Sequence, residues 1–272
     1  MTPTVFILVS CRKPELLPAA LMVFESIRIG FPRARIMAHG NGLTGEALYE
    51  VNAACARVGV GFQNIDPIYH HEWIEELVEK EDRSFVICDT DMVFWREVED
   101  WGITAPLAGR FVPEFMCEFM KARSQSRLHT SLLFIDPARL RHLRQVYLEQ
   151  IPKAFYSPRP NLIYPQIVPL AAAGGVPAMY NPQVNLFFDT CAMLYHAVGG
   201  RAFIEKQLDC YDHLNCGTIS DLVGPHMTDG KMQERHRMIF QNHELARGIW
   251  RKQQEYLESR SPNRTAECAA CV

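Results

Sequence analysis

Strand-like and helix-like segments alternate along the first third of the chain, and this order constrains the fold more than any other feature. Short segments with strand-like patterns lie at residues 5–10, 34–38, 60–65 and 85–88, and the first and last of them are almost entirely apolar. Segments with helical spacing of apolar residues separate them, at residues 15–28, 45–58 (with Thr44 as the expected N-cap) and 71–81. Because parallel strands need crossover connections, this order predicts an α/β fold with a mainly parallel, doubly wound central sheet.

The rest of the chain is less regular and is interpreted as an elaborated C-terminal half of the same domain. We expect a strand at residues 132–135, a helix at residues 137–150 opened by Asp136, and short strands at residues 178–180 and 185–188. The proline-rich residues 152–165 predict a surface excursion, and residues 229–259 have charged, helical spacing. The predicted domain covers residues 1–259, and residues 260–272 are expected to form a flexible tail.

Composition excludes some functional classes. The 28 lysines and arginines nearly balance the 31 aspartates and glutamates, so no basic field argues for a nucleic-acid partner. The nine cysteines are scattered without regular spacing, which favours thiols in a reducing compartment over a disulfide framework. The apolar run near the N-terminus is too short for a signal peptide or a transmembrane segment. We therefore expect a cytoplasmic protein, either free or peripheral to a membrane.

The apolar segment at residues 85–88 ends in two carboxylates, Asp89 and Asp91, separated by Thr90. Alternation of side chains along a strand would place both carboxylates on the same side. In open α/β sheets the ligand crevice lies at the carboxyl ends of the strands. Carboxylate oxygens at that edge suit Mg²⁺ or Mn²⁺, ions that usually bind together with a substrate's phosphates. The alternative interpretation is an ordinary strand-end turn with solvated aspartates.

An alternating N-terminal half that ends in an apolar strand and an Asp-x-Asp motif resembles the GT-A glycosyltransferases. Three further segments agree with the resemblance: Ser10-Cys11-Arg12-Lys13 after the first strand, His39-Gly40-Asn41-Gly42 after the second, and residues 129–136 as a strand facing the donor sugar. The resemblance implies a single GT-A-like domain, with a nucleotide-binding half at residues 1–128 and a sugar and acceptor half at residues 129–259.

The resemblance also implies substrates and roles. The donor would be a nucleotide-sugar such as a UDP- or GDP-sugar, and the acceptor could be a saccharide, a lipid-linked group or a protein. Mn²⁺ or Mg²⁺ would bind Asp91 as principal ligand, with Asp89 sharing the metal or contacting the ribose. The residues implied to contact the donor are Ser10, Arg12, Asn41, Asp89, Thr130 and Ser131.

A third metal ligand is expected from the C-terminal half, usually a histidine. His213 and His226 are the two candidates, and either could instead be an ordinary histidine without a metal. His226 with Gly230 and Lys231 approximates the His-x-x-Gly-x-x-Lys pattern of glycogenin-like retaining enzymes, with shifted spacing. Lys231 would then supply positive charge to the leaving diphosphate, unless it is simply a surface lysine.

The catalytic group is open between several residues. Gln166 could match the glutamine of the Asp-Gln pair of retaining enzymes, but the aspartate of that pair is missing. An inverting enzyme needs a carboxylate base, for which Asp189 is our candidate and Glu114 and Asp212 are alternatives. Asp189 could also simply cap a helix that starts near Thr190. Phosphate contacts are expected from Arg110, Arg123 and Arg127, and Trp95 and Trp101 could stack on a sugar.

Three other functions fit parts of the pattern. Residues 89–93 also match the Asp-x-Asp signature of haloacid-dehalogenase-like phosphohydrolases, in which the first aspartate is a nucleophile, although that motif normally lies on the first strand. Residues 216–221 resemble a turn of sugar nucleotidyltransferases, but such an enzyme would need a glycine-rich loop after the first strand, and residues 10–14 contain no glycine. A catalytically inactive protein that binds a nucleotide-sugar is the remaining alternative.

Overall fold

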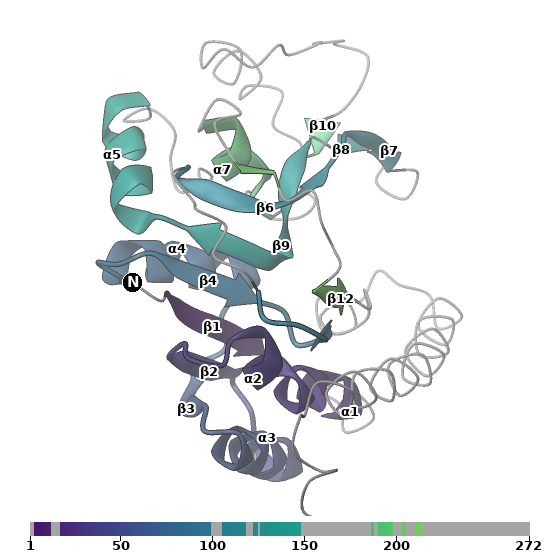
Figure 1. Ribbon diagram of the computed structural model, residues 1–272. Coiled ribbons are helices and arrows are strands. Elements are labelled where there is room, and N and C mark those ends of the chain that lie inside the picture. Colours follow the sequence, from purple (N-terminus) through teal and green to yellow (C-terminus); the bar gives the residue numbers. More distant parts are fainter. Residues whose placement is uncertain are drawn as a thin grey trace, which may run out of the picture.

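The computed structural model describes residues 3–11, 17–98, 105–117, 122–124, 126–147, 186–187, 190–197, 203–204 and 210–213 (Figure 1). Its principal elements are β1 (Thr4–Val9), β2 (Ile36–Asn41), α3 (Gly45–Arg57), β3 (Gly61–Ile65), α4 (His70–Lys80), β4 (Phe85–Cys88), β9 (Arg127–Ile135) and α5 (Pro137–Tyr147). The predicted alternation of strands and helices in the first part of the chain is therefore confirmed.

Within the described residues the central sheet has seven strands in the order β11-β6-β9-β4-β1-β2-β3, where β6 is Leu107–Val112 and β11 is Phe203–Ile204. Strands β3, β2, β1 and β4 pair in parallel, and β11 is parallel to β6. Strand β9 runs antiparallel to both of its neighbours, β4 and β6. The predicted mainly parallel α/β fold is confirmed, with one reversed strand inserted beside the strand that carries the acid pair.

Two hydrophobic clusters pack on opposite faces of this sheet. Alternate residues of β1 divide between them, because successive side chains of a strand point to opposite faces. Val5 and Ile7 pack in one cluster with the helices before β2 and with α3, whereas Phe6 packs in the other with Trp73 of α4. Helices on both faces of a mostly parallel sheet make this a doubly wound fold.

The helix predicted at residues 15–28 is not continuous, and this prediction was wrong. The described part consists of α1 (Leu17–Leu21), a 3₁₀ turn (Met22–Glu25) and α2 (Ile27–Gly30). The break has a long-range cause. The Val23 amide donates a hydrogen bond to the Thr90 carbonyl at 2.9 Å, and Ser26 Oγ accepts one from the Phe94 amide at 3.0 Å. The broken helix thus holds the segment that follows the acid pair.

Strand β2 runs further than predicted. It continues through His39, Gly40 and Asn41, which the sequence analysis placed after the strand, because β3 supplies pairing partners as far as Ile65. The turn begins at Gly42, whose φ of 65° is a conformation that favours glycine. Thr44 occupies the N-cap position of α3 as predicted, but its side chain makes no capping hydrogen bond.

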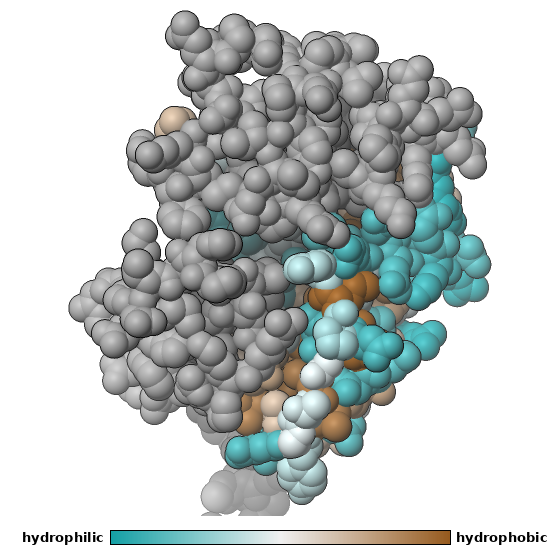
Figure 2. Space-filling model, turned by 180° about the vertical axis from the view of Figure 1, so that it is seen from behind, coloured by the Kyte–Doolittle hydropathy of each residue, from teal (hydrophilic) through white to brown (hydrophobic). Residues whose placement is uncertain are grey.

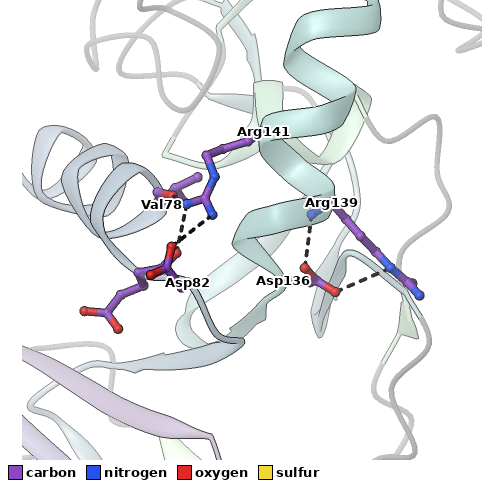
Figure 3. A network of polar contacts seen from close by, with 6 residues as sticks. Val78, Asp82, Asp136, Arg139 and Arg141 are labelled. Carbon is purple, nitrogen blue, oxygen red and sulfur yellow. Dashed lines mark hydrogen bonds and ion pairs between the residues drawn. The ribbon is translucent and has the colours of Figure 1, made fainter.

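Helix α5 begins at the predicted cap and is hydrogen-bonded to the end of α4 (Figure 3). Asp136 Oδ1 accepts a hydrogen bond from the Arg139 amide at 3.1 Å, which confirms the predicted N-cap. Arg141 donates to the carbonyls of Val78 and Glu81 at the end of α4. Helix α4 buries Trp73, Ile74, Leu77 and Val78 and exposes its charged face. In the view from behind, hydrophilic areas of the described surface alternate with hydrophobic ones (Figure 2).

Several short elements were not predicted: β5 (Met92–Phe94), β6, β7 (Phe115–Cys117), β8 (Ala122–Ser124), β11 and β12 (Tyr211–His213). The strand predicted at residues 185–188 appears as β10 (Leu186–Phe187), and the helix expected near Thr190 appears as α7 (Ala192–Ala197). The predictions for residues 152–165, 178–180, 229–259 and 260–272 lie outside the described residues. No helix in the described part is long and apolar enough to cross a membrane.

Candidate metal centre

Asp89 and Asp91 lie in the short connection between β4 and β5, and both are buried. Asp89 is 9% exposed and Asp91 is 1% exposed, so the alternative of a turn with solvated aspartates is wrong. The Asp89 amide donates to the Ser131 carbonyl of β9 at 2.8 Å, and the Thr90 carbonyl accepts from Val23. The connection is therefore held by the reversed strand on one side and by the broken helix on the other.

His213 reaches the acid pair through a strand pairing that links distant parts of the chain. Strand β12 pairs antiparallel with β5, with His213 opposite Met92, the residue after Asp91 (Figure 1). Its Nε2 lies 3.2 Å from Asp91 Oδ1 and 3.9 Å from Asp89 Oδ2. Both carboxylates thus face one histidine, as expected for the pair, although the two aspartates belong to a turn and not to an alternating strand.

His129 of β9 joins this group and was not predicted as a metal ligand. Asp89, His129 and His213 each offer a nitrogen or oxygen atom, and these atoms all lie within 4.8 Å of one another. The rings of His129 and His213 meet edge to face, with centroids 4.8 Å apart. The His129 Nδ1 accepts a hydrogen bond from the Ser131 amide at 3.1 Å. The sequence placed His129 at the start of the strand expected to face the donor sugar but gave it no role at the metal. The antiparallel pairing of β9 with β4 brings it to the acid pair.

The pairing of β6 with β9 is irregular at the position of His129. The register shifts between Gly109 and Phe111, which pair with Leu133 and Leu128 respectively. A Cβ atom at Gly109 would lie 3.0 Å from the Leu132 carbonyl oxygen, so glycine permits this close approach. Bulges of this kind often redirect side chains beside functional sites.

Burial and mutual repulsion govern the ionisation of the group. Burial, followed by the charge of Asp91, raises the pKa of Asp89 to about 7. Burial lowers the pKa of His213, but its hydrogen bond with Asp91 and the charges of Asp91 and Asp89 outweigh burial and leave that pKa raised. Burial and the two aspartates raise the pKa of Cys88. Two buried carboxylates beside a single protonatable histidine therefore leave negative charge that remains costly near neutral pH.

The chemistry of these donors fits a divalent cation. Carboxylate oxygens suit Mg²⁺ and Mn²⁺, and an imidazole nitrogen among them favours a transition metal such as Mn²⁺ over Mg²⁺. A divalent charge would relieve the repulsion that raises the pKa of Asp89. The residues that would hold the ion are Asp89, Asp91 and His213.

Two of the residues predicted to contact the nucleotide, Ser10 and Asn41, follow or end neighbouring strands β1 and β2 and bond to each other. Asn41 Nδ2 donates to Ser10 Oγ at 2.9 Å and to the Ile68 carbonyl at 3.0 Å, while its Oδ1 accepts from the Ile68 amide. The side-chain amide of Asn41 thus holds the loop after β3 in place. Contact of Ser10 and Asn41 with the nucleotide-sugar stays a prediction. Ser131 is fully buried, and its Oγ has no hydrogen-bond partner among the described residues.

Other predicted residues are placed only in part. Arg127 is buried, and its Nη1 donates a hydrogen bond to Ser124 Oγ at 3.4 Å. Arg110 and Trp95 are half-buried, and Glu114 is exposed between β6 and β7. Thr130 is half-buried in β9 beside His129. Arg12, Trp101, Gln166, Asp189, His226 and Lys231 lie outside the described residues, as do the side chains of Arg123 and Asp212. Their predicted roles stay predictions.

The features on which the sequence resemblance rests are therefore present together: parallel strands β3, β2, β1 and β4, an acid pair at the end of β4, and a reversed strand beside it that carries residues 129–131. The described residues have a GT-A-like fold. No protein-family model matches the sequence, and no curated protein matches it.

Solved structures show partial likeness to this GT-A-like fold. The galactosyltransferase LgtC, in complex with donor and acceptor sugar analogues, is 13% identical with a TM-score of 0.45, covering 92% of this chain and 99% of LgtC. The bifunctional glycosyltransferase WbbM is 8% identical with a TM-score of 0.45, covering 91% of this chain and 44% of WbbM. A putative glucose-1-phosphate thymidylyltransferase from Bacillus anthracis is 9% identical with a TM-score of 0.43, covering 87% of this chain and 95% of that protein. This chain thus spans less than half the length of WbbM, and likeness at this level does not identify a substrate.

Proposed function

We propose that this chain is a metal-dependent glycosyltransferase that moves a sugar from a nucleotide-diphosphate sugar to an acceptor. The observation that carries the proposal is the buried group of Asp89, Asp91 and His213 at the carboxyl end of β4, with His213 Nε2 3.2 Å from Asp91 Oδ1. This is the edge of an α/β sheet at which ligands bind.

The charge of this group supports a substrate with phosphates. One histidine can offset at most one of the two buried carboxylates, so a divalent cation is expected to complete the balance. The carboxylates leave part of such an ion's coordination open, and diphosphate oxygens are the usual additional ligands. When bound, the ion would neutralise negative charge that develops on the leaving diphosphate.

The protein's own residues would position the reactants. Asp91 would be the principal ligand, and Asp89 would share the ion or accept a hydrogen bond from the ribose. Strand β9 places Thr130 and Ser131 beside the pair, since the Ser131 carbonyl bonds to the Asp89 amide at 2.8 Å, so these residues are proposed to face the donor sugar. Asp189 and Gln166 remain our candidates for the catalytic group, and Lys231 and His226 for further contacts with the diphosphate and the metal.

The experiment that tests this function is a panel of UDP-, GDP- and other nucleotide-sugars with Mn²⁺, scored by release of nucleoside diphosphate. We expect release with at least one donor, and a loss of about 100-fold or more in Asp91→Asn, since even residues that only support metal ligands typically contribute 10–100-fold. Asp82→Asn is the matched control because Asp82 is 97% exposed and lies at the far end of β4.

Two outcomes would redirect the assignment. Hydrolysis of p-nitrophenyl phosphate with Mg²⁺, abolished in Asp89→Asn, would indicate a phosphohydrolase in place of a transferase. Binding of a nucleotide-sugar with Mn²⁺ but no release of diphosphate from any donor, with a range of acceptors present, would indicate an inactive binding protein.

A further inference from the structure

The role of His129 is open in the proposed site. It lies in β9 at the register shift opposite Gly109 and Phe111, and a nitrogen of its ring is within 4.8 Å of both a carboxylate oxygen of Asp89 and a nitrogen of His213. Distance alone would make it a further metal ligand. Its hydrogen bonding argues otherwise.

The Ser131 amide fixes the tautomer of His129. A backbone N–H can only donate, so the 3.1 Å contact from the Ser131 nitrogen makes His129 Nδ1 an acceptor with its lone pair engaged. A neutral imidazole carries one proton, which must then be on Nε2. That Nε2 has no lone pair to give to a metal ion. Neither ring nitrogen of His129 therefore has a lone pair free to bind a metal ion, and Nε2 carries an N–H group.

The surroundings hold this N–H group in place. The Ser131 amide holds the ring, and the Ser131 carbonyl accepts the Asp89 amide at 2.8 Å, so one residue links the ring of His129 to the backbone of the acid pair. The edge-to-face contact with His213 restricts the ring on another side. An N–H group fixed beside a cation site is suited to an anionic oxygen that also contacts the cation.

We propose that His129 donates a hydrogen bond from Nε2 to a phosphate oxygen of the diphosphate that binds at the cation of Asp89, Asp91 and His213. This inference rests on the proposed function for the presence of a diphosphate group. His129 is then a binding residue of the donor site, distinct from the metal ligands, and it would orient the diphosphate relative to the ion.

Two variants separate the hydrogen-bond donor from a metal ligand. His129→Phe keeps a flat ring against His213 but has no N–H group, whereas His129→Gln keeps an N–H donor on a flexible side chain. His142→Phe is the matched control, because His142 is exposed on α5. Circular dichroism and thermal unfolding would establish that each variant folds.

The probes are Mn²⁺ alone and then inorganic pyrophosphate at saturating Mn²⁺. Titration followed by electron paramagnetic resonance gives the Mn²⁺ affinity, and its pulsed form detects nitrogen bound to the ion. We expect His129→Phe to keep the Mn²⁺ affinity within about twofold and to keep the nitrogen signal of His213, while pyrophosphate binds about tenfold more weakly, equivalent to about 1.4 kcal/mol. His129→Gln should recover part of that loss.

Other results would overturn the inference. Loss of Mn²⁺ affinity together with loss of nitrogen coupling in His129→Phe would make His129 a ligand. Unchanged pyrophosphate affinity in that variant, or no pyrophosphate binding by the wild-type protein with Mn²⁺, would remove the proposed hydrogen bond. The same measurements separate the inference from the proposed function. If the wild-type protein releases diphosphate from a nucleotide-sugar but His129→Phe keeps its pyrophosphate affinity, only the inference is contradicted. If His129→Phe binds pyrophosphate more weakly but no donor releases diphosphate, only the transferase activity is contradicted.

Discussion

His213 Nε2 lies 3.2 Å from Asp91 Oδ1, and the pairing of β12 with β5 brings the two residues together from distant parts of the chain. The contact joins a buried histidine to a buried carboxylate, with a second carboxylate 3.9 Å away on Asp89. Without a cation this histidine bridges the pair. With a cation, the same three side chains would bind the ion in place of one another.

Removing His213 should weaken metal binding without unfolding the protein. We expect His213→Ala to lower Mn²⁺ affinity by about 10–100-fold, because the loss of one direct ligand should cost at least as much as the loss of a residue that supports one. The measurement is Mn²⁺ titration by electron paramagnetic resonance, with His142→Ala as the exposed control. An affinity equal to that of the wild-type protein would exclude His213 from the site.

Replacing Asp89 by a neutral residue should abolish stabilisation by Mn²⁺ and should not lower the stability of the metal-free protein. At pH 8 the ionised carboxylate is unfavourable, because burial and the charge of Asp91 raise its pKa to about 7. We expect metal-free Asp89→Asn to unfold at the same temperature as the wild-type protein or a higher one. Mn²⁺ should stabilise the wild-type protein by about 2.7 kcal/mol at one hundred times its Kd, and should not stabilise the variant. A variant that Mn²⁺ still stabilises fully would contradict a role for Asp89 in holding the ion.

The stability of the metal-free protein should fall as the pH rises. A raised carboxyl pKa means that the folded protein binds protons more tightly than the unfolded chain does, so the stabilising contribution is complete below the ordinary value of 3.8 and is lost as the pH passes about 7. The raised pKa of His213 acts in the same direction, with loss above its ordinary value of 6.5. Thermal unfolding between pH 5 and 8, with and without Mn²⁺, measures this dependence.

Because protons and the cation compete for the same atoms, the increase in Tm caused by Mn²⁺ should grow between pH 6 and pH 8. Asp89→Asn should flatten the pH dependence of the metal-free protein. A Mn²⁺ effect that is larger at pH 6 than at pH 8 would contradict the assignment of these residues as its ligands.

The close packing of Gly30 against Phe94 should be essential to the position of the acid pair. A Cβ atom at residue 30 would lie 2.5 Å from Phe94 Cδ1, and Phe94 belongs to β5, directly after the pair. We expect Gly30→Ala to lower the free energy of unfolding by about 1–3 kcal/mol through overpacking and to weaken Mn²⁺ binding. The double variant Gly30→Ala with Phe94→Leu should recover part of both losses, which chemical denaturation and Mn²⁺ titration would measure.

The sequence predicted those parts of the fold whose signals are local. Strands β1 and β4 are continuous apolar runs, and the acid pair follows β4 directly. The prediction of one helix at residues 15–28 was wrong because the Val23 amide donates a hydrogen bond to the Thr90 carbonyl and Ser26 Oγ accepts one from the Phe94 amide. No local periodicity reveals these contacts with the segment after β4.

The candidate site was predictable in its carboxylates and only partly in its histidines. Strands β5 and β12 have three residues each, too few for an alternating pattern, so the pairing that places His213 is invisible in the sequence. His129 depends on the reversed direction of β9 and on its register shift opposite Gly109, both of which are long-range properties. Local sequence patterns thus identified the edge of the sheet that carries the acid pair, whereas long-range strand pairing brings the two histidines to it.

The central claim is that Asp89, Asp91 and His213 hold a divalent cation that binds a nucleoside diphosphate. Isothermal titration of UDP, GDP and the other common nucleoside diphosphates, in Mn²⁺ and in a chelator, tests it most directly. We predict binding of at least one nucleotide with Mn²⁺, none in the chelator, and none to Asp91→Asn with Mn²⁺ present. Failure of every nucleotide to bind with Mn²⁺, or equal binding in the chelator, would contradict the account.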